Sequence, residues 1–252
     1  MILEKIGRKI GRLGQLIEYY KLLSLRKRGV SIDDFLKLSQ PWLLKTQVNT
    51  VFDIGANEGQ FASLIHEVLP TATIYSFEPL EDCYEKLKES MQEVNNFRAF
   101  NLALGDTNGK LTMHRNEHSP SSSILPMANL HKQNYPHTAK NTIIEVRSAR
   151  LDDVAKDLKI EKNLLIKIDV QGFESKVIAG GEKTIGHAEI LIIETSFQPL
   201  YIGQPLFDDI YDSLKKDFRY IGSLGEARIN RIDGSPLFED SIFLKKSSKA
   251  LG

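Results

Sequence analysis

The segment 51–59 (VFDIGANEG) carries the pattern that most clearly points to chemistry. A strand-like run contains Asp53 near its end and enters a turn with glycines at positions 55 and 59. Gly55 and Gly59 allow positive φ angles and let a ligand approach the backbone closely, and the helix that follows would offer unpaired N–H groups at its start. Ligands of doubly wound sheets bind at such carboxyl ends of strands. The segment therefore predicts a ligand-binding turn.

The side chains around this turn distinguish between classes of ligand. A dinucleotide fold would present G-x-G-x-x-G to a pyrophosphate, but Asn57 replaces the second glycine and Asp53 adds a negative charge. A carboxylate disfavours a phosphate and suits an ammonium group, which S-adenosylmethionine supplies. Glu78 ends the next strand-like run, 25 positions after Asp53, where a carboxylate can accept both hydroxyls of a ribose. Because Glu78 also suits a nicotinamide cofactor, Asp53 discriminates more.

Two further acids end later strand-like runs. Asp169 follows the apolar run that begins at residue 164, and Glu194 stands near the end of the run 190–195. On neighbouring parallel strands both would point into one crevice. There they could bind Mg²⁺ or Mn²⁺ through hard oxygen atoms, accept a proton, or fix the amino group of the donor. Lys167 lies inside the apolar run and is expected to pair with a strand-end carboxylate, because an unpaired buried ammonium is costly.

The elements that must position these residues alternate between strand-like and helical patterns, which predicts βαβ units and a mostly parallel sheet covered by helices on both faces. We expect an α/β fold with a seven-stranded sheet, closed by a late antiparallel pair. The expected strands are 49–54, 72–78, 97–104, 164–169, 190–195, 218–223 and 240–245. The expected helices are 58–68, 80–93, 172–179 and 206–217.

The overall composition excludes several classes of protein. The 252 residues are 41% hydrophobic and 26% charged, which is ordinary for a globular chain. Basic and acidic residues are equal in number, 33 each, so no overall charge attracts nucleic acid. The single cysteine, Cys83, excludes a disulfide framework and a four-cysteine zinc site. No apolar run approaches the roughly 18 residues that cross a bilayer. We expect a cytoplasmic protein.

The chain divides into an extension, residues 1–45, and a domain, residues 46–252. Residues 1–28 carry eight basic and two acidic side chains, a net charge of +6, with apolar residues at helical spacing. We expect a basic amphipathic helix that packs on the domain or in a homodimer, or lies on the inner face of an anionic membrane. Within the domain, residues 105–142 interrupt the strand–helix rhythm and contain four histidines. Such an insertion is typical of a substrate lid.

Three blocks of this sequence, in this order, resemble the signature blocks of FkbM-family methyltransferases. They are DIGANEG at 53–59, FEP at 77–79 and KIDVQGFE at 167–174, and the resemblance extends over about residues 48–245. It implies a class I methyltransferase (Rossmann-like) fold and O-methyl transfer from S-adenosylmethionine to a hydroxyl of a sugar, glycan or other small molecule. It does not cover the first 45 residues.

The resemblance also implies which residues bind the donor. They are Asp53, Gly55, Ala56, Asn57 and Gly59 around the methionine moiety, Glu78 and Pro79 at the ribose, and Ala103, Leu104 and Asp106 at the adenine. Asp169 and Glu194 are the expected catalytic residues. Metal-dependent sugar O-methyltransferases place acids at these two strand ends, which keeps the metal hypothesis open.

Gln171 leaves the function of this third block undecided. Many relatives resemble D-V-E-G here, and an amide cannot accept the proton that a glutamate would, so Gln171 can only orient a hydroxyl. Positioning of the two reactants can supply most of the acceleration of methyl transfer. A nicotinamide oxidoreductase and a non-catalytic binding protein remain as alternatives. Methylation of nucleic acid is not expected, because Val170–Gly172 lacks the Asn/Asp-Pro-Pro-aromatic clamp. Of the histidines, His114 and His118 are the best candidates for a role beside the lid.

Overall fold

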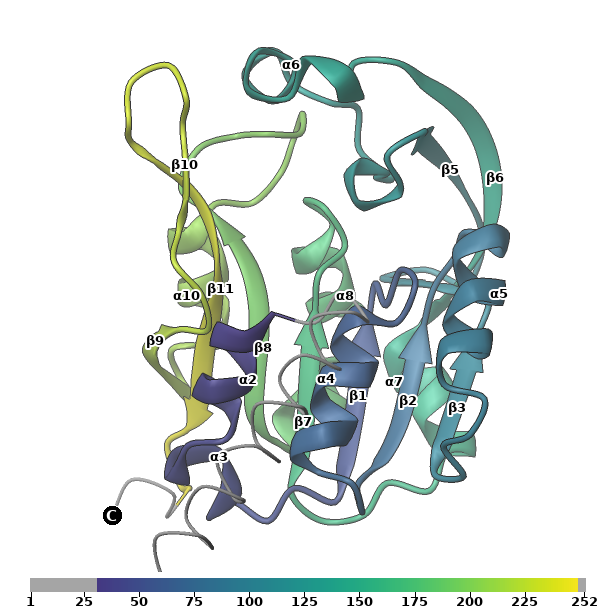
Figure 1. Cartoon of the computed structure of the whole chain (residues 1–252), viewed down its shortest axis with the longest axis vertical. Coiled ribbons are helices and arrows are strands. Elements are labelled where there is room, and N and C mark those ends of the chain that lie inside the picture. Colours follow the sequence, from purple (N-terminus) through teal and green to yellow (C-terminus); the bar gives the residue numbers. More distant parts are fainter. Residues whose placement is uncertain (1–30, 249–252) are drawn as a thin grey trace, which may run out of the picture.

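The computed structural model describes residues 31–248 and contains a central sheet of eight strands in the order β10-β11-β8-β7-β1-β2-β3, with β9 also beside β11 (Figure 1). A smaller sheet has the order β4-β6-β5. The strands are β1 (Thr50–Ile54), β2 (Thr73–Phe77), β3 (Phe97–Phe100), β4 (Ala103–Gly105), β5 (Gly109–Asn116), β6 (Asn141–Arg150), β7 (Leu164–Ile168), β8 (Ala188–Ser196), β9 (Phe218–Ser223), β10 (Arg228–Ile229) and β11 (Pro236–Lys245).

The central strands confirm the predicted mostly parallel sheet. β1 runs parallel to β2 and β7, β2 to β3, and β7 to β8. β11 is antiparallel to β8 and β9, as expected for the late pair. The eighth strand is the two-residue β10, which pairs with the start of β11 and was not predicted. This α/β arrangement, mostly parallel with a late antiparallel strand, agrees with the fold that the sequence resemblance implies.

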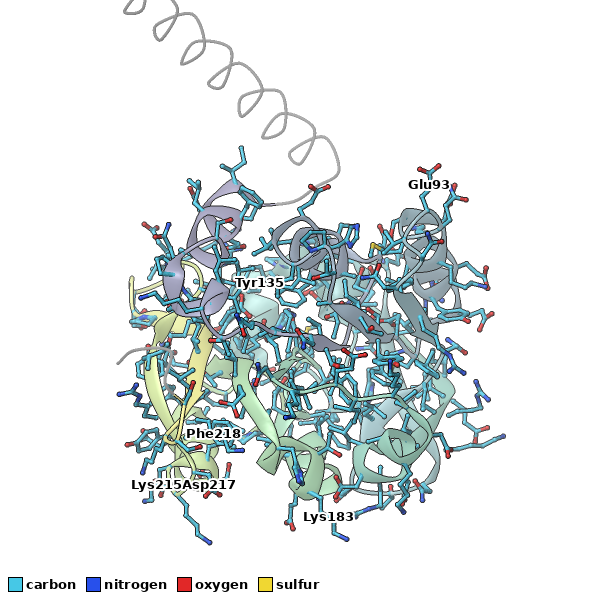
Figure 2. The ribbon with its side chains drawn as sticks, turned by 90° about the horizontal axis from the view of Figure 1, so that it is seen from below. Glu93, Tyr135, Lys183, Lys215, Asp217 and Phe218 are labelled. Atoms are coloured by element: carbon cyan, nitrogen blue, oxygen red, sulfur yellow. The ribbon has the colours of Figure 1, made fainter. Side chains whose placement is uncertain are left out.

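Successive side chains of a strand point to opposite faces of the sheet, and those of the central strands are apolar on both faces. Helices therefore cover both faces. Val51 and Ile74 face the layer of α2 (Ile32–Leu38), α4 (Gln60–Val68) and α5 (Glu81–Ser90). Phe52 and Phe77 face the layer of α7 (Leu151–Val154), α8 (Glu174–Gly180), α9 (Glu182–Gly186) and α10 (Phe207–Leu214). Figure 2 shows the two layers end-on, with Lys183 and Lys215 at the outer edge of the second.

The run predicted as one strand over 97–104 is broken into two strands that belong to different sheets. Asn101 lies at the break, and its Nδ2 donates to the carbonyl oxygens of Glu78 at 3.1 Å and Pro79 at 3.0 Å. These hydrogen bonds turn the chain, so β3 stays in the central sheet while β4 pairs with β6. The break places β4 beside the end of β2.

The predicted lid, residues 105–142, is a structured segment rather than a loop. It contains β5, α6 (Asn129–Asn134), two 3-10 turns (Ser119–Ser121 and Pro136–Thr138) and the start of β6. β5 and β6 form an antiparallel pair from Gly109–Ser148 to Asn116–Asn141. In Figure 1, α6 and β5 stand above the carboxyl ends of the central strands, opposite the β10–β11 hairpin. Movement of this segment as a lid remains a prediction.

The division predicted at residue 45 separates elements that pack together. Ser31 caps α2, because its Oγ accepts the N–H of Asp34 at 3.2 Å. Leu38 at the end of α2 and Leu43 in α3 (Pro41–Leu44) are both 0% exposed, in the same apolar cluster as α4. Residues 31–45 therefore belong to the core of the domain, which their short apolar pattern did not reveal.

The basic segment 1–28 lies outside the described residues. Its predicted helix, dimer contact and membrane contact therefore stay predictions. None of the helices within residues 31–248 has the length and apolar character that crossing a membrane requires.

Candidate active site

The turn after β1 is fixed by close backbone packing. Gly55 has φ 83°, and a Cβ atom there would lie 1.8 Å from the carbonyl oxygen of Asp169, so only glycine fits. Asn57, with φ 48°, points its backbone N–H at Oε2 of Glu78, 2.8 Å away. The turn thus joins the ends of β1, β2 and β7 at one place.

Glu78 is a buried carboxylate, 4% exposed, at the end of β2. Its Oε1 accepts the N–H of Leu80 at 2.8 Å, and its Oε2 accepts that of Asn57. Burial raises its pKa to about 7, although these two hydrogen bonds act in the opposite direction. Each carboxylate oxygen retains a further lone pair that can accept a hydroxyl.

Glu78 lines a cavity, here called the Glu78 cavity, with an empty volume of about 690 Å³ including its mouth. Its walls combine apolar side chains with a few polar groups, as ligand pockets do. Six of the predicted donor-binding residues line it, namely Gly55, Asn57, Glu78, Pro79, Ala103 and Leu104. The apolar walls include Leu102, Met113, Ile124 and Phe173.

A second cavity, the Asp240 cavity, adjoins the other side of the turn. Gly55, Asn57, Pro120 and Asp169 line both cavities. The remaining lining includes Ala56 and the charged side chains of Asp34, Lys167 and Asp240. Oδ1 of Asp240 is buried without a hydrogen-bond partner in the described part of the chain, and burial raises the pKa of this carboxyl to about 6.

Asp53 lines neither of these cavities, so its predicted contact with the donor stays a prediction. It is 0% exposed and faces the interior with Ser76, whose Oγ donates to Oδ2 at 3.3 Å. Its Oδ1 has no hydrogen-bond partner, and burial raises its pKa to about 6 even though Lys167 lies in register beside it. Asp53 therefore lies beneath the site rather than in its wall.

Gly59 and Asp106 are also absent from the walls of the Glu78 and Asp240 cavities. Gly59, with φ 93°, begins α4, and a Cβ atom there would lie 2.6 Å from Oγ of Ser90. Close packing against α5 explains this glycine. Asp106 forms an ion pair with Lys176 at 2.9 Å, and this hydrogen bond lowers the pKa of the carboxyl. The adenine contact predicted for Asp106 stays a prediction, because the structure shows this carboxylate only in a surface ion pair.

Asp169 and Glu194 do come together, as predicted, but an amide lies between them. Nε2 of Gln171 donates to Oδ1 of Asp169 and to Oε1 of Glu194, both at 2.9 Å. Oε1 of Gln171 in turn accepts the hydroxyl of Tyr201 at 2.8 Å. Gln171 thus orients the two acids. The sequence analysis predicted only that it orients a substrate hydroxyl.

Lys167 confirms its predicted pairing. Its Nζ lies 2.8 Å from Oδ2 of Asp169, and only 9% of its side chain is exposed. Burial acts to lower the pKa of Lys167, but the carboxylates around it outweigh burial and raise the pKa above its ordinary value. Asp169 therefore has one oxygen on an ammonium and the other on an amide.

This arrangement does not fit a divalent cation at Asp169 and Glu194. The space between the acids holds the donor nitrogen of Gln171, and Lys167 already neutralises Asp169. Among residues 31–248, no three His, Cys, Asp or Glu side chains are grouped as metal ligands. Burial, followed by the nearby charge of Asp169, raises the pKa of Glu194 well above its usual value.

A third cavity, the His131 cavity, begins at the same acids. Pro120, Asp169 and Gln171 line it together with the Glu78 cavity, and Glu194 lies in its wall. His118, predicted to lie beside the lid, lines this cavity. His114 lies in β5 instead, and its Nδ1 is 3.4 Å from Oδ1 of Asn141 at the start of β6.

Several residues of the site were missed by the sequence analysis. Asp34, Tyr201, Asp240 and His131 lie outside the three signature blocks, and their positions next to Asp169 and Gln171 depend on tertiary packing. The one local signal was the placement of His131 in the histidine-containing insertion.

Comparison of the sequence with known proteins identifies relatives of this chain. The model of the methyltransferase FkbM domain matches residues 53–221. The chain is 34% identical over 179 residues to the 2-O-methyltransferase NoeI of Sinorhizobium fredii (strain NBRC 101917 / NGR234), covering 68% of this chain and 73% of that protein. It is 26% identical over 171 residues to the methyltransferase sdnD of Sordaria araneosa, covering 58% and 65% of the two chains.

Among solved structures, a methyltransferase FkbM from Methylobacillus flagellatus KT matches with a TM-score of 0.49 and 12% identity. The match covers 79% of this chain and 44% of that one, so this chain spans less than half of that protein.

Proposed function

Because the chain belongs to the FkbM methyltransferase family, whose model matches residues 53–221, we propose that it transfers the methyl group of S-adenosylmethionine to a hydroxyl of a sugar, glycan or other small molecule. The name of the 34% identical relative, a 2-O-methyltransferase, supports oxygen as the methyl acceptor. The observation that carries the choice of donor is the lining of the Glu78 cavity, which combines a buried carboxylate beside a glycine turn with mostly apolar walls and, among the described residues, no Lys or Arg that could face a pyrophosphate.

The Glu78 cavity fits the adenosine part of this donor. The remaining lone pairs of Glu78 can accept the two ribose hydroxyls. Leu102, Ala103 and Leu104 can cover the adenine, together with Phe173. Among residues 31–248, no Lys or Arg lines the cavity, which disfavours the pyrophosphate of a nicotinamide cofactor. The donor supplies an activated methyl group on sulfur, and the protein has to place an acceptor oxygen opposite it.

The Asp240 cavity fits the amino-acid end of the donor. Asp34 and Asp240 offer carboxylates to an ammonium group, while Lys167 offers an ammonium to a carboxylate. The unpartnered Oδ1 of Asp240 favours this assignment, because a buried acceptor without a partner costs about 1–3 kcal/mol that a bound donor group would recover. The Asp240 and Glu78 cavities meet at Gly55 and Asn57, so one elongated molecule can extend through both.

In this proposal Asp169 lies between donor and acceptor. It lines the Glu78, Asp240 and His131 cavities, whereas Glu194 lines only the last of them. Asp169 can therefore accept a hydrogen bond from the acceptor hydroxyl and align its oxygen for attack. Gln171 and Lys167 hold Asp169 in place, and Asp169 can receive the proton as the hydroxyl becomes an ether and S-adenosylhomocysteine leaves. Because the residues do not fit a cation here, no metal takes part in this proposal.

The experiment that tests this proposal compares ligands and then looks for chemistry. Isothermal titration calorimetry with S-adenosylhomocysteine should show binding that Glu78→Ala weakens, whereas NADH should not bind. Glu93→Ala is the matched control, because Glu93 is exposed at the edge of the molecule (Figure 2). Radiolabelled methyl transfer from S-adenosylmethionine to a panel of sugars then identifies acceptors. Binding of NADH in place of S-adenosylhomocysteine would establish the oxidoreductase, and donor binding without transfer to any acceptor would establish a non-catalytic binding protein.

A further inference from the structure

The His131 cavity lies where an acceptor must enter if the proposed function holds. It has an empty volume of about 1100 Å³ including its mouth and shares Asp169, Gln171 and Pro120 with the Glu78 cavity. Figure 1 shows α6 and β10 standing above the carboxyl ends of β7 and β8. The cavity therefore has acids at the sheet edge, and its upper walls come from the lid segment and the β10–β11 hairpin.

The upper walls carry two arginines and three histidines. His118, His131 and His137 come from the segment 105–142, while Arg228 and Arg231 come from β10 and the turn after it. The rings of His118 and His137 are 5.5 Å apart, so the two side chains face the same space. A cavity of this composition suits a negatively charged group.

His131 is a buried polar side chain whose ring nitrogens have no hydrogen-bond partner among residues 31–248. It is 4% exposed. Its ring lies between those of Tyr135 and Tyr201, with centroids 5.1 Å away in both cases. Burial and the neighbouring His137 lower its pKa to about 4, so the ring is neutral at pH 7 and has one N–H donor and one acceptor nitrogen. Because buried polar groups are nearly always paired, these nitrogens indicate a polar ligand.

The two arginines are exposed and available. Arg231 stacks on Tyr135 at 5.5 Å from the ring centroid, which leaves its N–H donors unused. Within the described part of the chain, neither Arg228 nor Arg231 joins an ion pair. Arg228 acts on Asp240 only through its charge. Guanidinium groups with free donors match the planar arrangement of oxyanion acceptors.

We propose that the His131 cavity binds an acceptor sugar through an anionic substituent held by Arg228, Arg231 and His131, with the reacting hydroxyl at Asp169. That the bound sugar is the methyl acceptor rests on the proposed function, but anion binding in the cavity can be tested without it. A phosphate, a sulfate or a carboxylate has the required chemistry. The acids at the other end repel the anion, so the charges of the cavity set the direction in which the sugar enters.

The test measures binding of glucose 1-phosphate and of glucose to the full chain by calorimetry at constant ionic strength, with and without S-adenosylhomocysteine. Glucose 1-phosphate should bind at least ten-fold more tightly than glucose. The double variant Arg228→Gln/Arg231→Gln should lose this advantage. The matched control is Arg98→Gln/Arg219→Gln, which removes two exposed charges elsewhere, one of them from an arginine that also stacks on an aromatic ring. The control should retain affinity within two-fold.

Glucose 6-sulfate and glucuronate, measured in the same way, identify which anion the cavity prefers. Histidine ring signals in an NMR titration with inorganic phosphate provide a second readout: those of His131 should shift, whereas those of His66, outside the cavity, should not. Equal affinity for glucose and all three anionic sugars, or an equal loss in both double variants, would overturn the proposal. If the phosphate advantage is present but S-adenosylhomocysteine does not bind, the anion site stands and the proposed methyl transfer fails.

Discussion

The amide nitrogen of Gln171 lies 2.9 Å from the carboxylate of Glu194, at the point where a general base or a metal ion was expected. The same nitrogen donates to Asp169, and the Tyr201 hydroxyl fixes its orientation by donating to the amide oxygen. Gln171 has φ 54°, a backbone conformation that few non-glycine residues adopt. The structure therefore holds this amide in a strained position in which it separates two acids.

From this geometry we predict that methyl transfer does not depend on a metal ion. The wild-type enzyme should keep its activity after exhaustive chelation, because Gln171 and Lys167 already satisfy the acids. Gln171→Glu would place a third carboxylate beside Asp169 and Glu194. We expect that variant to bind Mn²⁺ and to lose at least about 3 kcal/mol of transition-state stabilisation, or two orders of magnitude in kcat, because it loses both donated hydrogen bonds.

Calorimetry with Mn²⁺ and a labelled-methyl assay measure the two effects. Gln198→Glu is the control, since Gln198 bonds to Ser235 and Pro236, away from the acids. Loss of wild-type activity on chelation, restored by Mg²⁺, would contradict the assignment of these residues.

The donor assignment predicts that two carboxylates recognise different ends of one molecule. Glu78→Ala should weaken binding of both S-adenosylhomocysteine and 5′-methylthioadenosine, which lacks the amino acid, by about 1–3 kcal/mol. Asp240→Asn should weaken only the former, because Asp240 lines the other cavity. Asp233→Asn, an exposed acid on the same hairpin, is the control.

Calorimetric affinities of the two ligands for each variant decide this point. The same loss for both ligands in Asp240→Asn would mean that the amino-acid end lies elsewhere.

The buried carboxyl of Asp53 should make the stability of the protein depend on pH. Burial raises its pKa from 3.8 to about 6, so the folded protein binds this proton more tightly than the unfolded chain does. Stability contributed by the protonated group is present below pH 4 and is lost as the pH rises to about 6. Asp53→Asn cannot ionise, so its free energy of unfolding relative to wild type should increase by about 1–3 kcal/mol over that interval and then stay constant.

Urea unfolding of both proteins between pH 4 and pH 8 gives this difference directly. A difference that does not change with pH, or one that falls as the pH rises, would show that Lys167 controls the ionisation of Asp53 more strongly than burial does.

The sequence allowed the parallel sheet and the wall of the Glu78 cavity to be predicted, because both depend on local patterns. Apolar runs that end in Glu78 or Asp169 have a defined place in an α/β sheet. The place of Asp53 outside the cavity walls could not be predicted, because an acid near the end of a strand can face either the ligand or the layer beneath it. That choice depends on the register beside Ser76 and Lys167, which the sequence of one strand does not contain.

The remaining part of the site depends on distant segments. Tyr201 reaches Gln171 across 30 positions, and Asp34 and Asp240 meet at one cavity from opposite ends of the chain. The split of the strand 97–104 followed from one asparagine, Asn101, whose amide bonds to the backbone of another strand end. Such contacts have no periodicity and no motif.

The basic segment 1–28 predicts a salt-dependent association. Attachment to anionic lipid rests on Coulomb attraction of about 1 kcal/mol per basic residue, which salt screens, whereas a contact made by apolar burial with protein should persist at high salt. We expect deletion of residues 1–28 to abolish either liposome binding or self-association. Liposome flotation and analytical ultracentrifugation at 50 mM and 500 mM salt distinguish the two. Unchanged behaviour in both assays after deletion would remove this segment as a contact site.

A longer deletion should act on the fold itself. Removing residues 1–45 takes Leu38 and Leu43 out of the core, and each buries its whole side chain. Each leucine contributes about 2–3 kcal/mol, so the loss approaches the total stability of a small domain, which is about 5–15 kcal/mol. The protein that lacks residues 1–28 keeps both leucines and should melt like the full chain in circular dichroism.

The full-length variant Leu38→Ala/Leu43→Ala should reproduce most of the destabilisation, because it leaves two cavities in the same cluster. Leu36→Ala, on the exposed side of α2, is the matched control and should change the melting temperature little. If the chain without residues 1–45 melts with the full chain, the core ends at residue 46 after all. In that case the loss of Asp34 should still appear as weaker binding of S-adenosylhomocysteine with unchanged binding of 5′-methylthioadenosine, because Asp34 lines the cavity assigned to the amino-acid end of the donor.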